Sequence, residues 1–125
     1  MIKVLLYLWQ LPQNLLGLAL VKILKARRQG LIFYTDKYQF GVSLGNYIIF
    51  GGNVTATDFK HEIGHQKQSR YLGIFYLLII GLPSLLGNLW DRVFHKSWNN
   101  QKRIDWYYSQ PWEAWADRLG GVIRW

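Results

Sequence analysis

The sequence predicts one α+β domain, in which a small three-stranded sheet is flanked by an N-terminal helix and two later helices. Three observations predict this class. A chain of 125 residues, half of them hydrophobic, suits a single core. Runs of β-branched and aromatic residues with turn signals lie between two regions of helical pattern. No internal repeat or low-complexity tract divides residues 1–125, so one domain is expected.

The first element is expected to be one long helix, Ile2–Arg28, bent at Pro12. Its last turn is basic, which suits the negative end of the helix dipole. Gly30 follows, as is typical after a helix.

Three short strands are expected next. Leu31–Thr35 is rich in β-branched and aromatic residues. Tyr38–Leu44 and Tyr47–Phe50 follow, with Gly45–Asn46 between them as a tight hairpin signal. Gly51–Gly52–Asn53 then closes the sheet.

The second half of the chain reads mainly as helix. Thr57 or Asp58 is the expected N-cap of a helix that runs to about Arg70. A second apolar segment should break at Pro83, and residues 88–108 are expected to form an irregular loop.

A last helix is expected from Ser109 or Gln110 to Gly120–Gly121. Pro111 is well placed in its first turn, because that position needs no amide donor.

Two uncharged stretches, Val4–Val21 and Tyr71–Trp90, approach the roughly 20 apolar residues that span a bilayer. Each contains proline and polar residues or glycines, which weaken a membrane-span assignment. We therefore expect core helices more readily than spanning helices. Two localisations stay open, a cytoplasmic one, which the absence of cysteine fits, and a membrane-associated one. A cleavable signal peptide is not expected, because no A-x-A-like site follows the first stretch.

The composition limits the possible partners and metal ligands. Fifteen Lys and Arg face seven Asp and Glu, a surplus that attracts nucleic acid, anionic membranes or acidic substrates, or simply keeps an apolar protein soluble. No nucleic-acid-binding motif accompanies the charge, so nucleic acid is not expected. There is no cysteine, so a metal would be held by nitrogen and oxygen.

One motif carries chemistry: His61-Glu62-Ile63-Gly64-His65 is H-E-x-x-H on an expected helix. Histidines four residues apart lie on one face, where they can share a zinc ion. Glu62, next to the first ligand, can then take a proton from a water on the zinc. The structural alternative is a solvated helix face with two unrelated histidines.

A catalytic zinc needs a third protein ligand and an open position. His95 and Glu113 are the candidates, and Glu113 is the only glutamate outside the motif. Asp117 lies one turn beyond Glu113, so it can accept a hydrogen bond from a ligating histidine. The alternative for both carboxylates is a polar helix face, but His2Glu is a standard catalytic set, which favours Glu113.

The H-E-x-x-H motif followed by E-x-x-x-D on a later helix resembles the thermolysin-like gluzincin metallopeptidases, and the short chain is similar to minigluzincins. The resemblance implies a minimal zincin fold. It also implies that His61 and His65 bind zinc and that Glu62 is the general base. Glu113 would be the third ligand and Asp117 would support His61.

The sequence departs from that pattern in two places. Trp112 stands where the pattern has Asn, and no histidine follows Glu113 to stabilise the transition state. Tyr107 and Tyr108 are candidate donors to the oxyanion, as is His95, although tyrosines of this kind are more often core or interface residues.

Gluzincins bind extended peptides along a strand upstream of the active-site helix. By resemblance, Gly41–Gly45 is the candidate strand, with Val42, Ser43 and Leu44 as substrate-binding residues. Main-chain hydrogen bonds would hold a substrate of almost any sequence. An ordinary hairpin strand is the alternative.

The sequence thus predicts a zinc metallopeptidase that acts on a peptide or protein substrate. Two alternatives remain: the same peptidase associated with a membrane surface, and a non-catalytic, zinc-stabilised module whose basic face binds a partner.

Overall fold

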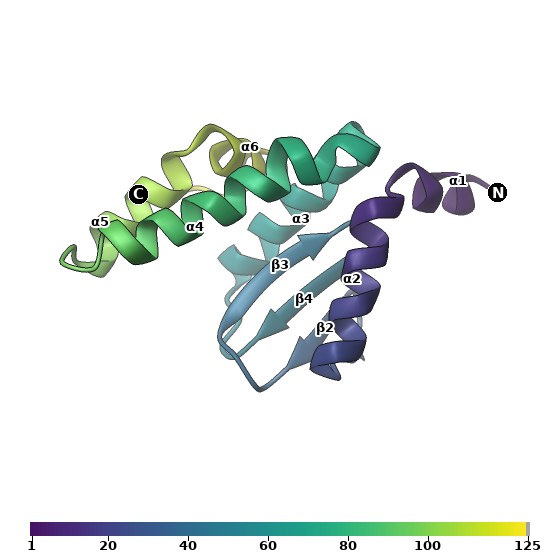
Figure 1. The fold of residues 1–125 in the computed structure, drawn as a ribbon, viewed down its shortest axis with the longest axis horizontal. Coiled ribbons are helices and arrows are strands. Elements are labelled where there is room, and N and C mark those ends of the chain that lie inside the picture. The colour runs from purple at the N-terminus through teal and green to yellow at the C-terminus, as the bar shows by residue number, and fades with distance from the viewer. Residues whose placement is uncertain (125) are drawn as a thin grey trace.

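The computed structural model describes residues 1–124 and has an α+β architecture (Figure 1). Within that range, six α-helices accompany a four-stranded sheet. The helices are α1 (Ile2–Trp9), α2 (Leu11–Leu24), α3 (Ala56–Leu72), α4 (Leu82–Phe94), α5 (Asn100–Ser109) and α6 (Pro111–Gly120). The strands are β1 (Arg27–Gln29), β2 (Ile32–Thr35), β3 (Phe40–Leu44) and β4 (Tyr47–Gly51).

The sheet has the order β1-β2-β4-β3, so the expected three-stranded sheet is wrong by one strand. The additional strand, β1, consists of three exposed polar residues, which show no apolar alternation. It pairs antiparallel with β2, whereas β2 and β4 run parallel. β3 and β4 form the expected hairpin through Gly45–Asn46, with Gly45 at a φ of 64°. β3 is therefore an edge strand.

The expected N-terminal helix is two helices. α1 and α2 meet at 87°, and the break lies at Gln10, just before Pro12. α2 ends at Leu24 because Lys25 takes a left-handed conformation, with a φ of 53°. That conformation is rare for a lysine, so composition gives no sign of the early end.

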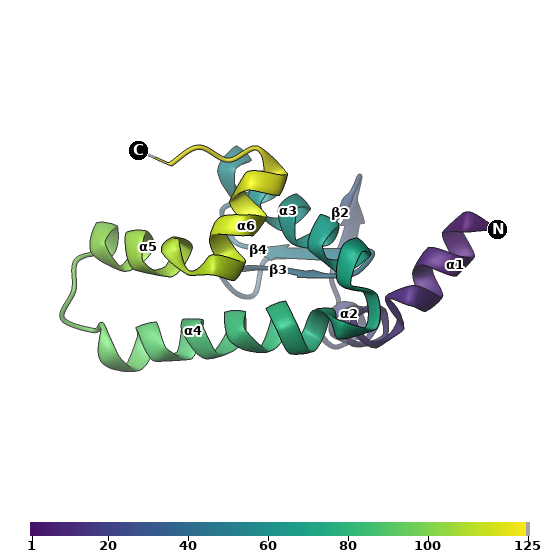
Figure 2. The ribbon, with the colours of Figure 1, turned by 90° about the horizontal axis from the view of Figure 1, so that it is seen from above.

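The sheet lies between two helices. α2 packs against β3 and β4 on one face, and α3 packs against the same strands on the other (Figures 1 and 2). α6 lies directly against α3. The centre of the core is β4, where Ile48, Ile49 and Phe50 are buried.

The expected loop at residues 88–108 is wrong, because most of it is helical. α4 continues to Phe94, and α5 begins at Asn100 with Asn99 as its N-cap. Pro83 does not break the chain either. A π-helical turn, Leu77–Gly81, leads directly into α4. Pro83 lies in the first turn of α4, where its missing amide hydrogen is tolerated after this wider turn.

The expectation that both uncharged stretches are core helices is also wrong, because their large apolar side chains are mostly exposed. Residues 77–94 are long and apolar enough to cross a membrane, yet only 11% of this segment is buried. The bent pair α1 and α2 passes the same test of length and composition when taken together.

Candidate metal centre

The H-E-x-x-H motif lies in the middle of α3, which begins earlier than expected. Thr55, not Thr57 or Asp58, is the N-cap. Its side chain accepts a hydrogen bond from the amide of Asp58, and the Asp58 carboxylate accepts one from the amide of Thr55. This capping box fixes the first turn of the helix, so His61 and His65 follow on one face.

Two glycines allow α3 and α6 to touch through their backbones. A β-carbon on Gly64 would overlap the carbonyl of Ala116, and one on Gly120 would overlap the carbonyl of Lys60. Such close contact brings side chains from two helices into one buried cluster. The glycine between the motif's histidines is thus required by packing.

His61, His65 and Glu113 converge at this contact. One ligand atom from each lies within 4.8 Å of the other two, and all three residues are buried. The Glu113 Oε1 atom lies 2.9 Å from Nε2 of His65 and 3.6 Å from Nε2 of His61. Two imidazole nitrogens and a carboxylate oxygen in this arrangement can hold a metal ion.

The other nitrogen of each imidazole is held by an oxygen. The His61 Nδ1 atom lies 2.7 Å from Oδ1 of Asp117, and the His65 Nδ1 atom lies 2.7 Å from Oε1 of Gln68. Because these oxygens accept hydrogen bonds, each Nδ1 carries the proton. Both Nε2 atoms are therefore directed to the shared point near Glu113.

The cluster has strong electrostatic coupling. Burial alone would lower the pKa of His61, but hydrogen bonds with Asp117 and Glu113 outweigh it and raise this pKa to about 9. Burial would raise the pKa of Glu113, yet the two histidines lower it to about 2. Without a metal, the fold therefore favours protonated imidazole beside ionised Glu113.

Glu62 differs from the other acidic residues of the cluster. It is buried, and its Oε2 atom has no hydrogen-bond partner among residues 1–124. Burial raises the pKa of its carboxyl group, an effect that the neighbouring histidines oppose. A buried carboxylate with a free oxygen is placed to accept a proton from a bound molecule.

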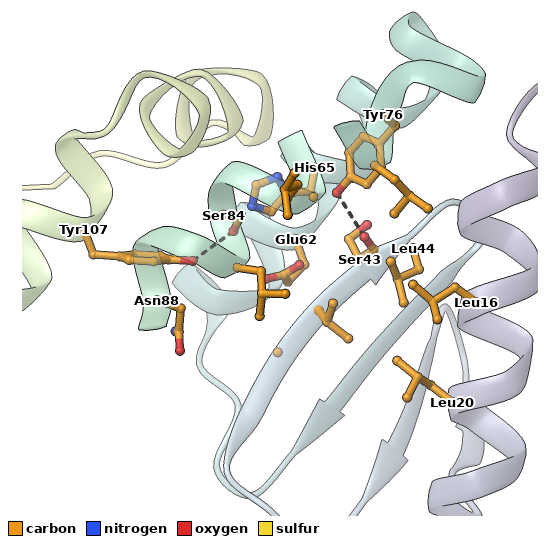
Figure 3. Close-up of a pocket in the computed structure, with 16 residues that line it drawn as sticks. Leu16, Leu20, Ser43, Leu44, Glu62, His65, Tyr76, Ser84, Asn88 and Tyr107 are labelled. Carbon is orange, nitrogen blue, oxygen red and sulfur yellow. Dashed lines mark hydrogen bonds between the residues drawn. The ribbon is translucent and has the colours of Figure 1, made fainter. Parts of the chain in front are cut away.

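A cavity of about 480 Å³ opens beside Glu62 and His65 (Figure 3). β3 forms its floor, while leucines from α2 and from α4 form its sides. A second, more polar hollow of about 230 Å³ lies on the His61 side. Both are lined by Gly41, Glu62, Asn88 and Tyr107, so the two hollows meet at Glu62.

The two candidate tyrosines occupy different positions. The Tyr107 hydroxyl lies 3.0 Å from Oγ of Ser84, which in turn donates to Glu113 at 3.1 Å. The ring of Tyr108 packs edge-on against His61, with ring centroids 4.9 Å apart. Tyr107 thus presents its hydroxyl to the cavity, whereas the ring of Tyr108 restrains His61.

The candidate substrate strand is the edge strand β3, beside α3. Its Ser43 carbonyl accepts a hydrogen bond of 3.0 Å from the Tyr76 hydroxyl, so this carbonyl points away from β4. Backbone groups two residues apart point the same way, so those of Gly41 also face outward. Val42 and Leu44 line the larger cavity together with Ser43.

His95, the alternative third ligand, is not in the cluster. Its Nδ1 atom lies 2.9 Å from Asp91, and its ring stacks on Trp98 at 3.6 Å between centroids. Asp91 also binds Arg103, so this site forms its own ion-paired group where α4 meets α5.

Sequence reasoning missed three residues that hold the cluster. Gln68 lies three residues after His65 on the same helix face, a spacing that could have identified it. Arg124 binds the Asp117 carboxylate through two hydrogen bonds, and Ser84 reaches Glu113 from α4. Both come from elements outside the motif helices, so no local spacing indicates them.

No family model, no curated protein and no solved structure matches this chain.

Proposed function

We propose that the protein is a zinc-dependent peptidase with its active site between α3 and α6. The observation that carries this proposal is the convergence of His61, His65 and Glu113 in a buried cluster that opens into a cavity. The resemblance of both motifs to those of gluzincins points to the same reaction.

The donor set suits zinc. Two imidazoles and one carboxylate are a common catalytic set for this metal, and they leave a position for water or substrate. The oxygen partners on both Nδ1 atoms, from Asp117 and Gln68, hold the rings in the tautomer that binds through Nε2. When bound, zinc would supply Lewis acidity, polarising a carbonyl and lowering the pKa of a water molecule.

Glu62 is the proposed general base. Its buried carboxylate has an oxygen free of other partners, and burial raises the pKa of this carboxyl group, which makes it a stronger base than an exposed glutamate. It accepts a proton from the attacking water and then donates this proton to the leaving amine, so Glu62 returns to its starting ionised state.

Tyr107 is the proposed donor to the oxyanion. Its hydroxyl lies at the cavity and donates to Ser84, whose own proton goes to Glu113; in the proposed reaction the Tyr107 hydroxyl turns from Ser84 to the oxyanion. Burial raises its pKa well above the ordinary value, so the hydroxyl keeps its proton at neutral pH and remains a donor. Tyr108 is assigned a positioning role against His61.

The substrate is proposed to be an extended peptide. The outward backbone groups of Gly41 on β3 are free to pair with a peptide strand, as in β-strand addition. Leucine is the commonest residue lining the cavity beyond, which favours an apolar side chain next to the scissile bond.

The test is hydrolysis of casein and of a peptide library by the zinc-loaded protein. Replacing Glu62 by Gln keeps the shape but removes the base, so the rate should fall by about 10²–10⁴-fold while zinc is retained. The matched control is Asp105→Asn, which neutralises an exposed carboxylate on α5 and should leave the rate unchanged. Zinc-loaded protein that cleaves nothing, or a Glu62→Gln variant as active as wild type, would leave the non-catalytic module as the better account.

A further inference from the structure

α4 has its apolar side turned outward. Residues on its inner side are small or polar: Ser84 contacts Glu113, Gly87 is buried, and Asp91 binds Arg103. The outer side carries large apolar side chains at helical spacing, and each is roughly half exposed: Leu82, Leu85, Leu86, Trp90 and Phe94. Leu78, in the π-helical turn before α4, continues this row and is also exposed. A helix in contact with water has the opposite arrangement, because its apolar stripe faces the core.

α2 shows the same inversion. Its buried residues are Gln13, Asn14 and Gly17. The Gln13 amide donates to Ser69 and to the carbonyl of Gly73, and Asn14 accepts a bond from the amide of Asn46. None of its leucines is buried: Leu15 and Leu16 are about half exposed, and Leu16 and Leu20 line the cavity. Both helices therefore hold the protein together through polar contacts and present apolar surface to their surroundings.

The two apolar sides belong to one face of the molecule. In Figure 2 α4 runs along the lower edge, and α2 lies at the same edge beside the start of α4. The cavity lies between them, with Leu16 and Leu20 of α2 on one side and Ser84 and Asn88 of α4 on the other (Figure 3). Leu82 and Leu85 of α4 also line it. We call the outward side chains of α2 and α4 the apolar face; it is continuous with the mouth of the cavity.

The charges around this face have one sign. Residues 1–35 contain five Lys and Arg and no Asp or Glu, and Lys22 and Lys25 lie at the end of α2. The one acidic residue of α4, Asp91, is already paired with Arg103. Each basic residue near an anionic bilayer contributes about 1 kcal/mol to binding. Exposed Trp9 and Trp90 are of the type that is enriched at membrane interfaces.

We propose that the apolar face docks in the interface of an anionic lipid bilayer, so that the mouth of the cavity opens toward lipid. α4 lies in the membrane plane and does not span it, because α5 packs beside it and carries charged residues such as Lys102. Spanning would carry those charges into hydrocarbon. A helix lying in the plane immerses its apolar side by roughly 5–10 Å and leaves the other side with the protein.

A second copy of the chain fits the face less well. A two-fold interface on this face would place two surfaces with the same positive charge against each other, and like charges across an interface oppose association. An anionic bilayer complements both the apolar area and the sign of the charge.

Vesicle flotation tests the proposal with the metal-free Glu62→Gln protein, so the result does not depend on catalysis. The protein should float with phosphatidylcholine vesicles that contain phosphatidylglycerol and stay bound in high salt. Leu86→Glu/Val93→Glu, at positions 54% and 58% exposed, should reduce partitioning by about 10–100-fold. Leu31→Glu/Tyr38→Glu adds the same charge at exposed sites outside these helices and should float like the parent. No flotation of the parent, or equal loss in both pairs, would overturn the proposal.

Depth measurement gives an independent reading, because the chain has no cysteine and each introduced cysteine takes a single spin label. Labels at Leu86→Cys and Leu16→Cys should become accessible to oxygen and protected from a water-soluble nickel complex when vesicles are added. A label at Lys67→Cys, exposed on α3, should remain in water. Labels at 86 and 16 that stay in water would overturn the proposal. So would a dimer that buries them without vesicles.

Discussion

The contact between α3 and α6 and the outer side of α2 and α4 are composed in opposite ways. The contact buries His61, His65, Glu113 and Asp117, all of them ionisable. The outer side exposes leucines, with Leu85 and Leu86 both more than half exposed. Burying ionisable groups is unfavourable unless they are paired, and exposing leucines forgoes the main source of stability.

Because neither composition favours stability of the free chain, both point to a role in function. The polar contact is tolerated because its three candidate ligands each have a hydrogen-bond partner: Asp117 for His61, Gln68 for His65, and Ser84 for Glu113. No contact within the described residues explains why the leucines on the outer side of α2 and α4 are exposed, so we attribute them to the proposed contact with a bilayer. The residues at the α3–α6 contact are explained by the chemistry of the site, whereas the exposed apolar residues of α2 and α4 are explained by what the protein contacts.

The largest expected effect comes from closing the space between α3 and α6. Gly64→Ala should destabilise the protein by about 3 kcal/mol or more, because the new methyl group overlaps the carbonyl of Ala116 and the helices must separate. Gly87→Ala on α4 is the matched control, since its nearest neighbour would be a Trp112 atom 4.0 Å away. There alanine should stabilise by about 0.5–1 kcal/mol through helix propensity. Urea unfolding measures both, and a harmless Gly64→Ala would contradict the close contact.

The next effect concerns two similar ion-paired groups. Asp117 links Arg124 to His61, and Asp91 links Arg103 to His95. Asp117→Asn should weaken zinc binding by about 10–100-fold, because it removes the charge that orients His61. Asp91→Asn should leave zinc affinity unchanged. Competition with a chromogenic chelator measures the zinc affinity of both variants. Equal affinities would show that Asp117 is an ordinary polar residue with no role in zinc binding.

A graded effect is expected from pH in the metal-free protein. The folded state raises the pKa of His61 from 6.5 to about 9, so it binds this proton more tightly than the unfolded chain does. The resulting stabilisation is complete below pH 6.5 and is lost as pH rises toward 9, with a slope of at most about 1.4 kcal/mol per pH unit. Urea unfolding with a chelator present should show it, and His61→Gln should flatten the slope. Stability that rises over this range would contradict the buried pairing.

Most of the site could be predicted because its spacing is local. Four residues separate the two histidines, and four separate Glu113 from Asp117, so helical geometry alone puts each pair on one face. The contact between α3 and α6 could be expected only from chemistry, because residues of both helices must meet to bind one metal ion. The role of Gly64 and Gly120 in allowing this contact could be recognised only from the structure.

The fold was harder to predict where tertiary contacts override local preference. The polar strand β1 forms because β2 offers it a partner, and α2 ends at a lysine in a left-handed conformation. Most of residues 88–108 is helical although the stretch is polar and aromatic, because α4 and α5 pack side by side. The apolar character of residues 77–94 was visible, but periodicity cannot tell which side of a helix faces the core.

Zinc analysis of purified protein tests the central claim most directly. Wild-type protein, dialysed with limiting zinc, should retain one ion per chain, held by His61, His65 and Glu113. Glu113→Ala leaves two ligands, so it should lose the metal under the same dialysis. Gln101→Ala, an exposed change on α5, should keep it. Wild-type protein without zinc, or tight stoichiometric zinc in Glu113→Ala, would contradict the assignment of a metal centre between α3 and α6.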